Sequence, residues 1–400
     1  MSFKWKLRIF SVVLCACSVG VHAAEWKSEP SLFLKGQYND NVRLRADNAN
    51  PEGSTGFTLE PRIKFAGEEL NLWDIAVDAR AKVTRYQDIE DGDSENIFFV
   101  FDGGKQTERS EWRLNASLDR NINLDTDFDT SNPDNGAFND RTVRKTASIS
   151  PSVAIDASEI LRLTLFLNNT DVSFEEVTSL SYQDYTYSSL SFIADWTVAQ
   201  NHQLGFTSSY SEYESPGSSF SFDKSILQLD YTYIINPNAS AALSFGGRSL
   251  ESLRTVPVVG DLKNKDNGTV VKLSYSSRTE TASHRFTASR DVSPSSFGGA
   301  QEIRSATYLY RIENTERFTT KLILDASESS TINGTLVSRF NDRIRYRVEP
   351  SLTYKLNRNW NLQFLYRYIG QDFTGNDRDS AANAIFINLF LHWPKLATTY

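Results

Sequence analysis

From residue 31 onward, the chain repeats short segments in which apolar and polar residues alternate. Residues 57–65 (FTLEPRIKF) and 73–83 (WDIAVDARAKV) show the alternation clearly, and 161–167 and 343–349 repeat it. A period of two residues places successive side chains on opposite faces of a β-strand. No sustained helical period occurs after the first 25 residues. The pattern therefore predicts an all-β chain.

The connections between these segments alternate in length. Short turns are expected at 67–71, 106–110, 156–159, 199–202, 236–239, 280–283, 313–316 and 357–359. Longer polar loops are expected near 45–55, 88–95, 125–140, 177–183, 214–218, 254–267, 291–300, 328–341 and 371–380. The order predicts about 18 strands, with both chain ends on the short-turn side. This is the pattern of a transmembrane antiparallel up-and-down β-barrel, here over 31–393, with short periplasmic turns and longer extracellular loops.

The N-terminus has the pattern of an export signal. Lys4, Lys6 and Arg8 precede an apolar stretch at 9–21, and cleavage after Ala23 fits the small residues there. We expect a signal peptide at 1–23, a short periplasmic segment at 24–30 and a tail at 394–400 after the last strand.

Both cysteines of the chain, Cys15 and Cys17, fall inside the expected signal peptide. After cleavage no thiol nucleophile, disulfide or thiolate metal site is available. The rival interpretation is a lipid-attachment box that acylates Cys17.

Composition excludes several classes of protein. The net charge is −8 and becomes −11 when the three signal-peptide cations are removed, which argues against nucleic-acid binding. Aromatic residues make up 12%, too many for a disordered chain. Outside the first 25 residues no apolar run is long enough for a membrane-spanning helix. The mean hydropathy of −0.42 fits strands with only one apolar face.

Tryptophan residues gather at the short-turn ends of the predicted strands, which is typical of an aromatic girdle at a bilayer interface. The six expected members of a periplasmic girdle are Trp26, Trp73, Trp112, Trp196, Trp360 and Trp393. A second girdle is expected toward the long loops, at Tyr38, Tyr86, Tyr210, Tyr213 and Phe373. The alternative is that these tryptophans form the core of a soluble β-sandwich or solenoid.

Several segments resemble a family of uncharacterised Gram-negative outer-membrane β-barrel proteins of porin type, some of them encoded near exopolysaccharide or exosortase genes. The likeness is carried by EPSLFLKGQYNDNVRL (29–44), DIEDGDSENIFF (88–99), QTERSEWRLN (106–115) and LHWPKLATTY (391–400). The resemblance implies an integral protein of the cell outer membrane, and it brings no functional residues with it.

Candidate catalytic residues are few. The three histidines after the signal peptide, His202, His284 and His392, are expected at the periplasmic end on strands far apart in sequence. We therefore expect no enzyme and no cofactor. The acidic loop with Asp125, Asp127 and Asp129, and the one at 90–95, offer oxygen ligands for calcium. The alternative, which we prefer, is a solvated loop that meets lipopolysaccharide through divalent ions, and no metal site is predicted.

The alternation also predicts which charged residues line the lumen. The cations assigned to it are Arg62, Lys64, Arg80, Lys82, Arg113, Arg162, Lys272, Lys321, Arg343, Arg345, Arg347 and Arg367, and the anions are Glu60, Asp74, Asp78, Asp119, Asp325 and Glu349. The excess of cations predicts a basic inner wall below an acidic rim, with Arg343, Arg345 and Arg347 as a ladder of donors for anions. The alternative is that these groups pair across strands and stiffen the wall.

These observations predict a porin-like pore for passive diffusion of small hydrophilic solutes, with saccharides or organic anions as candidates. No plug domain is expected, and the loops at 125–140 and 254–267 are candidates to constrict the lumen. The alternatives are an accessory component of exopolysaccharide secretion and a closed structural or adhesive barrel. Expected partners are outer-membrane lipid, lipopolysaccharide, the barrel-assembly machinery and the solutes. No nucleic acid is expected, and no patch indicates an oligomeric state.

Overall fold

The computed structural model describes residues 25–69, 72–89, 92–122, 142–175, 182–256, 260–296, 298–332, 342–374, 379–393 and 396–399. The predicted signal peptide at 1–23 and the loop at 125–140 lie outside the described residues. Within them, no helix is long and apolar enough to cross a membrane.

The described chain is built almost entirely of antiparallel strands. They are β1 (Glu25–Asn39), β2 (Ser54–Glu69), β3 (Trp73–Tyr86), β4 (Ser94–Gln106), β5 (Ser110–Ile122), β6 (Val143–Ser158), β7 (Leu161–Glu175), β8 (Tyr185–Ala199), β9 (His202–Ser215), β10 (Phe220–Asn236), β11 (Ala239–Val256), β12 (Gly260–Arg278), β13 (Ala282–Ser295), β14 (Gly299–Glu313), β15 (Phe318–Ile332), β16 (Arg343–Lys355), β17 (Trp360–Phe373), β18 (Ser380–His392) and β19 (Leu396–Thr399). Two short 3-10 turns, η1 (Asp47–Ala49) and η3 (Pro216–Ser218), lie in connections.

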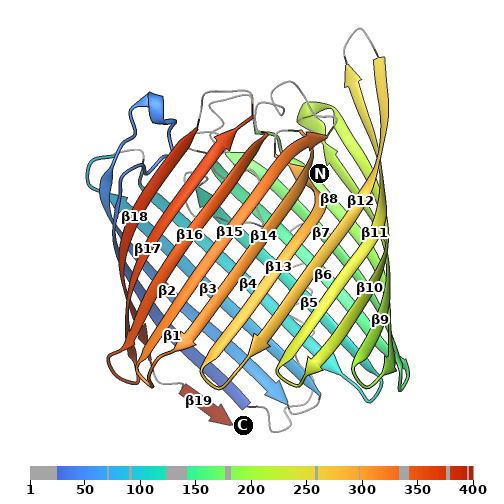
Figure 1. The fold of residues 1–400 in the computed structure, drawn as a ribbon, viewed down its shortest axis with the longest axis horizontal. Coiled ribbons are helices and arrows are strands. Elements are labelled where there is room, and N and C mark those ends of the chain that lie inside the picture. The colour runs from blue at the N-terminus through green and yellow to red at the C-terminus, as the bar shows by residue number, and fades with distance from the viewer. Residues whose placement is uncertain are drawn as a thin grey trace.

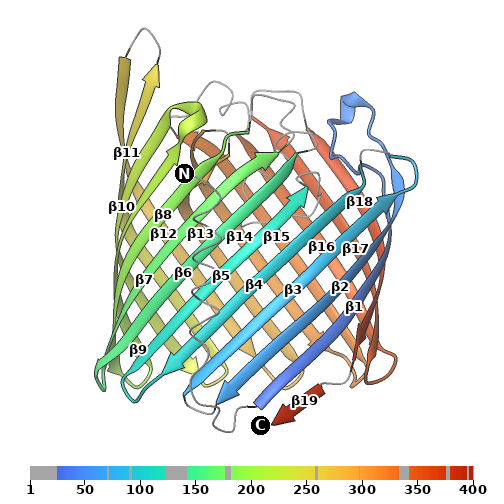
Figure 2. The same ribbon diagram turned by 180° about the vertical axis from the view of Figure 1, so that it is seen from behind.

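Strands β1 to β18 form a closed barrel (Figures 1 and 2). Each strand pairs with its neighbours in sequence, and β1 closes the ring by pairing with β18 from Ser31↔His392 to Asn39↔Ala384. Short turns and longer connections alternate between the two ends, which we name the short-turn end and the long-loop end. The predicted all-β, antiparallel, up-and-down barrel with about 18 strands is confirmed.

The register shows which side chains face outward. Residues paired across strands lie on the same face of a sheet, so one exposed apolar side chain orients a whole row. Phe57, Leu59 and Phe65 of β2 are exposed on the outer face, whereas Thr58, between two of them, is fully buried. The exposed apolar residues continue around the outer face, as Ile97, Leu118, Ile149, Leu165, Leu190, Leu229, Phe245, Leu324, Leu352, Phe364 and Ile385. The exterior is therefore apolar, as a surface in contact with lipid requires.

Both ends of the chain contain more strand than the sequence pattern indicates. β1 begins at Glu25, so the segment 24–30, expected to precede the barrel, mostly belongs to its first strand. The tail at 394–400 contains β19, which pairs with β1 from Glu25↔Thr399 to Ser28↔Leu396. Both corrections have one cause, because the backbone groups of β1 that extend below β18 find hydrogen-bond partners in the tail.

Two connections expected to be long loops are mostly strand. Residues 254–256 and 260–267 form the ends of β11 and β12, which stay paired up to Val256↔Gly260. β12 pairs with β13 only from Val271↔Arg290 to Arg278↔Ser283, so the end of the β11–β12 hairpin projects past its neighbours (Figure 1). Residues 291–295 and 299–300 likewise continue β13 and β14.

The end of the β13–β14 hairpin leaves the wall and folds into the lumen. Its Val292 packs in a buried cluster with residues of the inner face, Val172, Tyr185, Tyr213, Phe220, Phe222 and Leu250. Tyr213 donates a hydrogen bond to the Ser295 carbonyl (2.9 Å), and Lys224 donates one to the Val292 carbonyl (2.6 Å). This segment, rather than 254–267, narrows the described part of the lumen near the long-loop end.

Candidate functional site

The candidate site is the lumen, whose wall carries most of the chain's strand-borne charge. Register and alternation place all ten predicted lumen-lining cations on the inner face, namely Arg62, Lys64, Arg80, Lys82, Arg113, Arg162, Arg343, Arg345, Arg347 and Arg367. Their positions therefore fit the predicted alternation, but what they do depends on their partners.

On strands β2 to β7, most of the lumenal arginines pair with acids. Arg62 forms a two-pronged ion pair with Asp78 on β3. Arg113 donates to Asp74 (2.8 Å) and Glu111 (2.9 Å). Such cross-strand networks tie neighbouring strands together and leave little unbalanced charge on this wall.

In the predicted ladder on β16, Arg347 is engaged with acids, and Arg343 and Arg345 are buried. Arg347 forms an ion pair with Asp325 of β15, which is almost fully buried, and Arg367 of β17 donates to Glu349 (2.6 Å). Arg343 lies over the ring of Phe373 (5.8 Å), and Arg343 and Arg345 are both buried. These contacts support the stiffening alternative for this strand over a ladder that offers free donors to anions.

Alternation alone missed several lumenal carboxylates. Asp102, Glu111, Asp156, Asp195 and Asp230 face inward on β4 to β10, where register pairs them with other lumenal positions. Asp195 and Asp230 flank Gly205, where a Cβ would lie 2.9 Å from a carboxylate oxygen of Asp195. These carboxylates reduce the excess of cations that the predicted basic inner wall assumed on this side.

Three lumenal cations that the sequence pattern missed lie together on the opposite wall. Arg278, Arg285 and Arg311 face inward on β12, β13 and β14 at the short-turn end. They line a recess of about 510 Å³ around the β12–β13 turn, together with Glu280 and Glu313. Their strands show weaker alternation than β2 or β3, and extending the two-residue period through SHRFTASR would have found Arg285.

A second lumenal recess combines aromatic and polar groups. The rings of Phe33 on β1 and Phe390 on β18 lie 4.7 Å apart, and Arg62, Asn361 and Gln363 border the same space of about 520 Å³. Ligand sites commonly pair an aromatic surface with a few polar groups that fix orientation. The arrangement suits a small hydroxylated solute.

The inward β13–β14 hairpin is attached to the wall by buried ionic contacts. Glu302 accepts hydrogen bonds from Arg248 (3.1 Å), Arg290 (3.0 Å) and Arg304 (2.9 Å). Arg248, on the inner face of β11, also pairs with Asp266. Across the lumen, Pro294 of the hairpin borders a further space lined by residues of β4 to β8. The hairpin is thus a fixed constriction in this structure.

Aromatic residues mark the outer rims. All six predicted girdle tryptophans lie at the short-turn end on the outer face, and Trp26 and Trp73 are 5.9 Å apart. His202 and His284 join this belt through hydrogen bonds to Tyr231 and Tyr308 (2.8 Å each).

The second predicted girdle needs correction. Tyr38 and Tyr210 face outward, but Tyr213 and Phe373 are buried on the inner face. Tyr86 also points inward and accepts a hydrogen bond from Gln37 (2.7 Å). The reason is that these three have inward parity on their strands, and Tyr213 packs beneath the hairpin.

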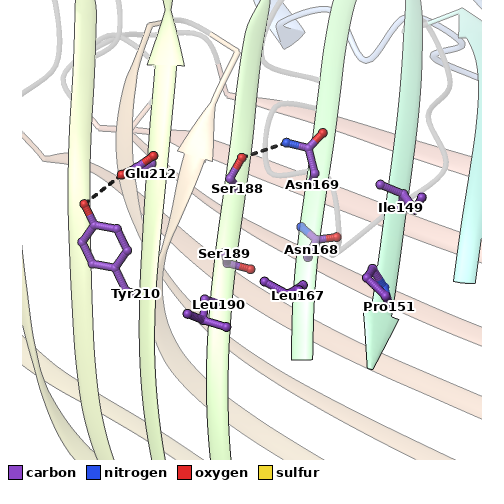
Figure 3. Close-up of a pocket in the computed structure, with 10 residues that line it drawn as sticks. All are labelled: Ile149, Pro151, Leu167, Asn168, Asn169, Ser188, Ser189, Leu190, Tyr210 and Glu212. Atoms are coloured by element: carbon purple, nitrogen blue, oxygen red, sulfur yellow. Dashed lines mark hydrogen bonds between the residues drawn. The ribbon is translucent and has the colours of Figure 1, made fainter. Parts of the chain in front are cut away.

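A shallow recess lies over β6 to β9 (Figure 3). Apolar Ile149, Leu167 and Leu190 line it, and its polar groups bond to one another, Asn169 to Ser188 (2.8 Å) and Tyr210 to Glu212 (3.0 Å). Because these polar groups bond to one another, they can lie beside an apolar surface without the cost of an unsatisfied hydrogen-bonding group.

Among the residues that the structure describes, no group of three or more His, Cys, Asp or Glu side chains is arranged to hold a metal ion. The acidic loop with Asp125, Asp127 and Asp129 lies outside that part of the chain.

No family model matches this chain, and no curated protein matches its sequence. Solved structures with a similar fold include Pseudomonas aeruginosa OccK2 (OpdF), with 10% identity, a TM-score of 0.47 and coverage of 91% of this chain and 98% of that one. A BenF-like porin from Pseudomonas fluorescens Pf-5 has 8% identity, a TM-score of 0.48 and coverage of 92% and 99%. Acinetobacter baumannii OccAB4 has 10% identity, a TM-score of 0.46 and coverage of 93% and 99%. At these values the likeness is one of barrel architecture and does not extend to solutes.

Proposed function

We propose that this protein is an integral outer-membrane pore through which small hydrophilic solutes diffuse passively. The observation that carries the proposal is the closed barrel of β1 to β18, with an apolar exterior and a charged, hydroxyl-rich interior. Barrels with about 16 to 18 strands are wide enough to enclose an aqueous channel. An apolar exterior around a polar interior is the reverse of the arrangement in a soluble fold.

The wall chemistry supports solutes that are polar and small. The recess with Phe33 and Phe390 suits saccharides, because an aromatic surface and amide groups meet there. The hairpin at 291–302 narrows the entrance at the long-loop end, which favours small molecules over polymers. This function needs no catalytic group or cofactor.

Lipid is the partner that the exterior fits. The tryptophan belt lies at the short-turn end, where inner-leaflet headgroups would meet it. Toward the long-loop end, the exterior carries ion pairs such as Arg85 with Glu95 and Lys145 with Glu175. Such charges suit contact with the phosphate groups of lipopolysaccharide. Insertion of the barrel into the membrane would use the barrel-assembly machinery.

The test is single-channel conductance of the refolded protein in a planar bilayer, with reversal potential under a salt gradient. The sample should first show a shift in gel mobility on heating, which reports a folded barrel. We expect a stable open conductance that is absent from heat-unfolded protein in the same detergent. A folded barrel that inserts and stays silent would refute the pore.

A further inference from the structure

The inner wall of β12 to β15 carries a row of cations at neighbouring positions near the short-turn end. Register pairs Arg278 with Ser283, Ser283 with Arg311, and Arg311 with Lys321. Arg285 lies one inward position above Ser283 on β13. We call Arg278, Arg285, Arg311 and Lys321 the basic row. Like charges directly opposite each other on a sheet are destabilising, so the row costs stability where it stands.

The basic row differs from lumenal arginines such as Arg113 and Arg347, because acids neutralise it only in part. Among the described residues, Arg278, Arg285 and Lys321 form no ion pair, and Arg311 pairs only with exposed Glu313 (3.1 Å). Arg113 and Arg347, by contrast, each contact more than one carboxylate. Glu280 and Glu313 are the acids that line the recess, so three arginines face two carboxylates there.

The recess gives the basic row a shape that a solute can enter. Its space of about 510 Å³ is lined by Arg278, Arg285 and Arg311 and by the hydroxyls of Ser276 and Ser283. Guanidinium groups hold carboxylates and phosphates with two parallel hydrogen bonds, and hydroxyls add single ones. A space of this size accommodates a small organic anion with several charged groups.

We propose that the basic row is a binding site for small multivalent organic anions, such as di- and tricarboxylates, at the short-turn mouth of the lumen. The proposal deepens the proposed pore function and rests on it, since the site lies where a solute that crossed the lumen would leave it. It also moves the anion site from the predicted Arg343–Arg345–Arg347 ladder, in which Arg347 is paired with acids and Arg343 and Arg345 are buried, to the strands on the other side of β15.

The test uses citrate as probe and the full folded barrel in detergent. Arg278, Arg285 and Arg311 are changed together to Gln, and citrate binding is measured by titration calorimetry. The matched control changes Arg85, Arg120 and Lys145 to Gln, which removes the same charge from outward positions near the opposite end. We expect the recess variant to bind citrate at least about tenfold more weakly, about 1.4 kcal/mol, and the control to bind like the parent.

Folding and pore activity are read separately. Removing like-charge repulsion should leave the recess variant at least as heat-resistant as the parent, and Arg285→Gln alone serves if the triple variant does not fold. If the parent does not bind citrate, or if the parent and the recess variant bind it equally well, the proposed anion site is wrong and the proposed pore function is unaffected. Citrate binding to a barrel that conducts no ions would overturn the pore and leave the site.

Discussion

Replacing Glu302 by Gln should loosen the inward β13–β14 hairpin. The Glu302 side chain is 8% exposed and accepts hydrogen bonds from Arg248, itself 3% exposed, and from the partly exposed Arg290 and Arg304. Removing one partner of a buried ion pair costs about 3–5 kcal/mol. Arg248 keeps Asp266 as a partner, so we expect about 2–3 kcal/mol, close to the value of hydrogen bonds to charged groups.

A loss of about 2–3 kcal/mol shifts the equilibrium between docked and released hairpin by about 30- to 150-fold. The assay takes advantage of the two cysteines falling within the expected signal peptide. In a Ser295→Cys background, where the position is fully buried, a membrane-impermeant thiol reagent reacts only when the hairpin opens. We expect Glu302→Gln to raise the labelling rate by a comparable factor and to increase single-channel conductance.

The matched control is Glu328→Gln on β15. Glu328 is 47% exposed and bonds to Arg304 (3.1 Å), so its loss should cost less than about 1 kcal/mol. Labelling of Glu302→Gln within about twofold of the parent, or equal to that of Glu328→Gln, would refute the argument that Glu302 holds the hairpin.

Two further predictions concern the wall itself. In a guanidinium titration, Gly246→Ala should lower the free energy of unfolding by about 1–3 kcal/mol, because the added Cβ would lie 2.2 Å from the backbone oxygen of Leu227. Gly247→Ala is the control: its added Cβ would have nothing within 4 Å, so this variant should be neutral or slightly stabilising. Arg347→Gln should lower the free energy of unfolding by about 3–5 kcal/mol, because Asp325 would stay buried without its ion pair. It should change the reversal potential less than the triple change of Arg278, Arg285 and Arg311 to Gln does. Equal unfolding midpoints for the two glycine variants would contradict the first prediction. An Arg347→Gln midpoint no lower than that of Lys64→Gln, which removes a lumenal cation from β2, would contradict the second.

The sequence predicted the fold well because a two-residue period is a local property of each strand. Residues 57–65 and 73–83 needed no knowledge of their neighbours to be assigned an inner and an outer face. Parity alone also assigns Arg62, Arg113 and Arg347 to the inner face. The girdle assignment of Tyr213 was wrong because its parity on β9 is inward, and the β13–β14 hairpin turns that inner surface into a buried core.

The partners of the lumenal charges were not predictable in the same way. Whether Arg347 meets Asp325 depends on the register between β15 and β16, and a shift of two residues would preserve every apolar position on both faces while changing every ion pair. The same limitation hid the basic row, since Arg278 and Arg311 lie 33 positions apart in the printed sequence and become neighbours only through Ser283.

The contrast between paired and unpaired charges gives a physical criterion for function in this lumen. Arginines such as Arg113 and Arg367 face inward but already hold carboxylates, so a passing anion would have to displace an oriented intramolecular partner. The basic row carries the opposite balance, because it adds like-charge repulsion to the folded barrel and has little acid to offset it. An anion bound there relieves that repulsion, and its binding should therefore raise the thermal stability of the parent while leaving the Arg278, Arg285 and Arg311 to Gln variant unchanged.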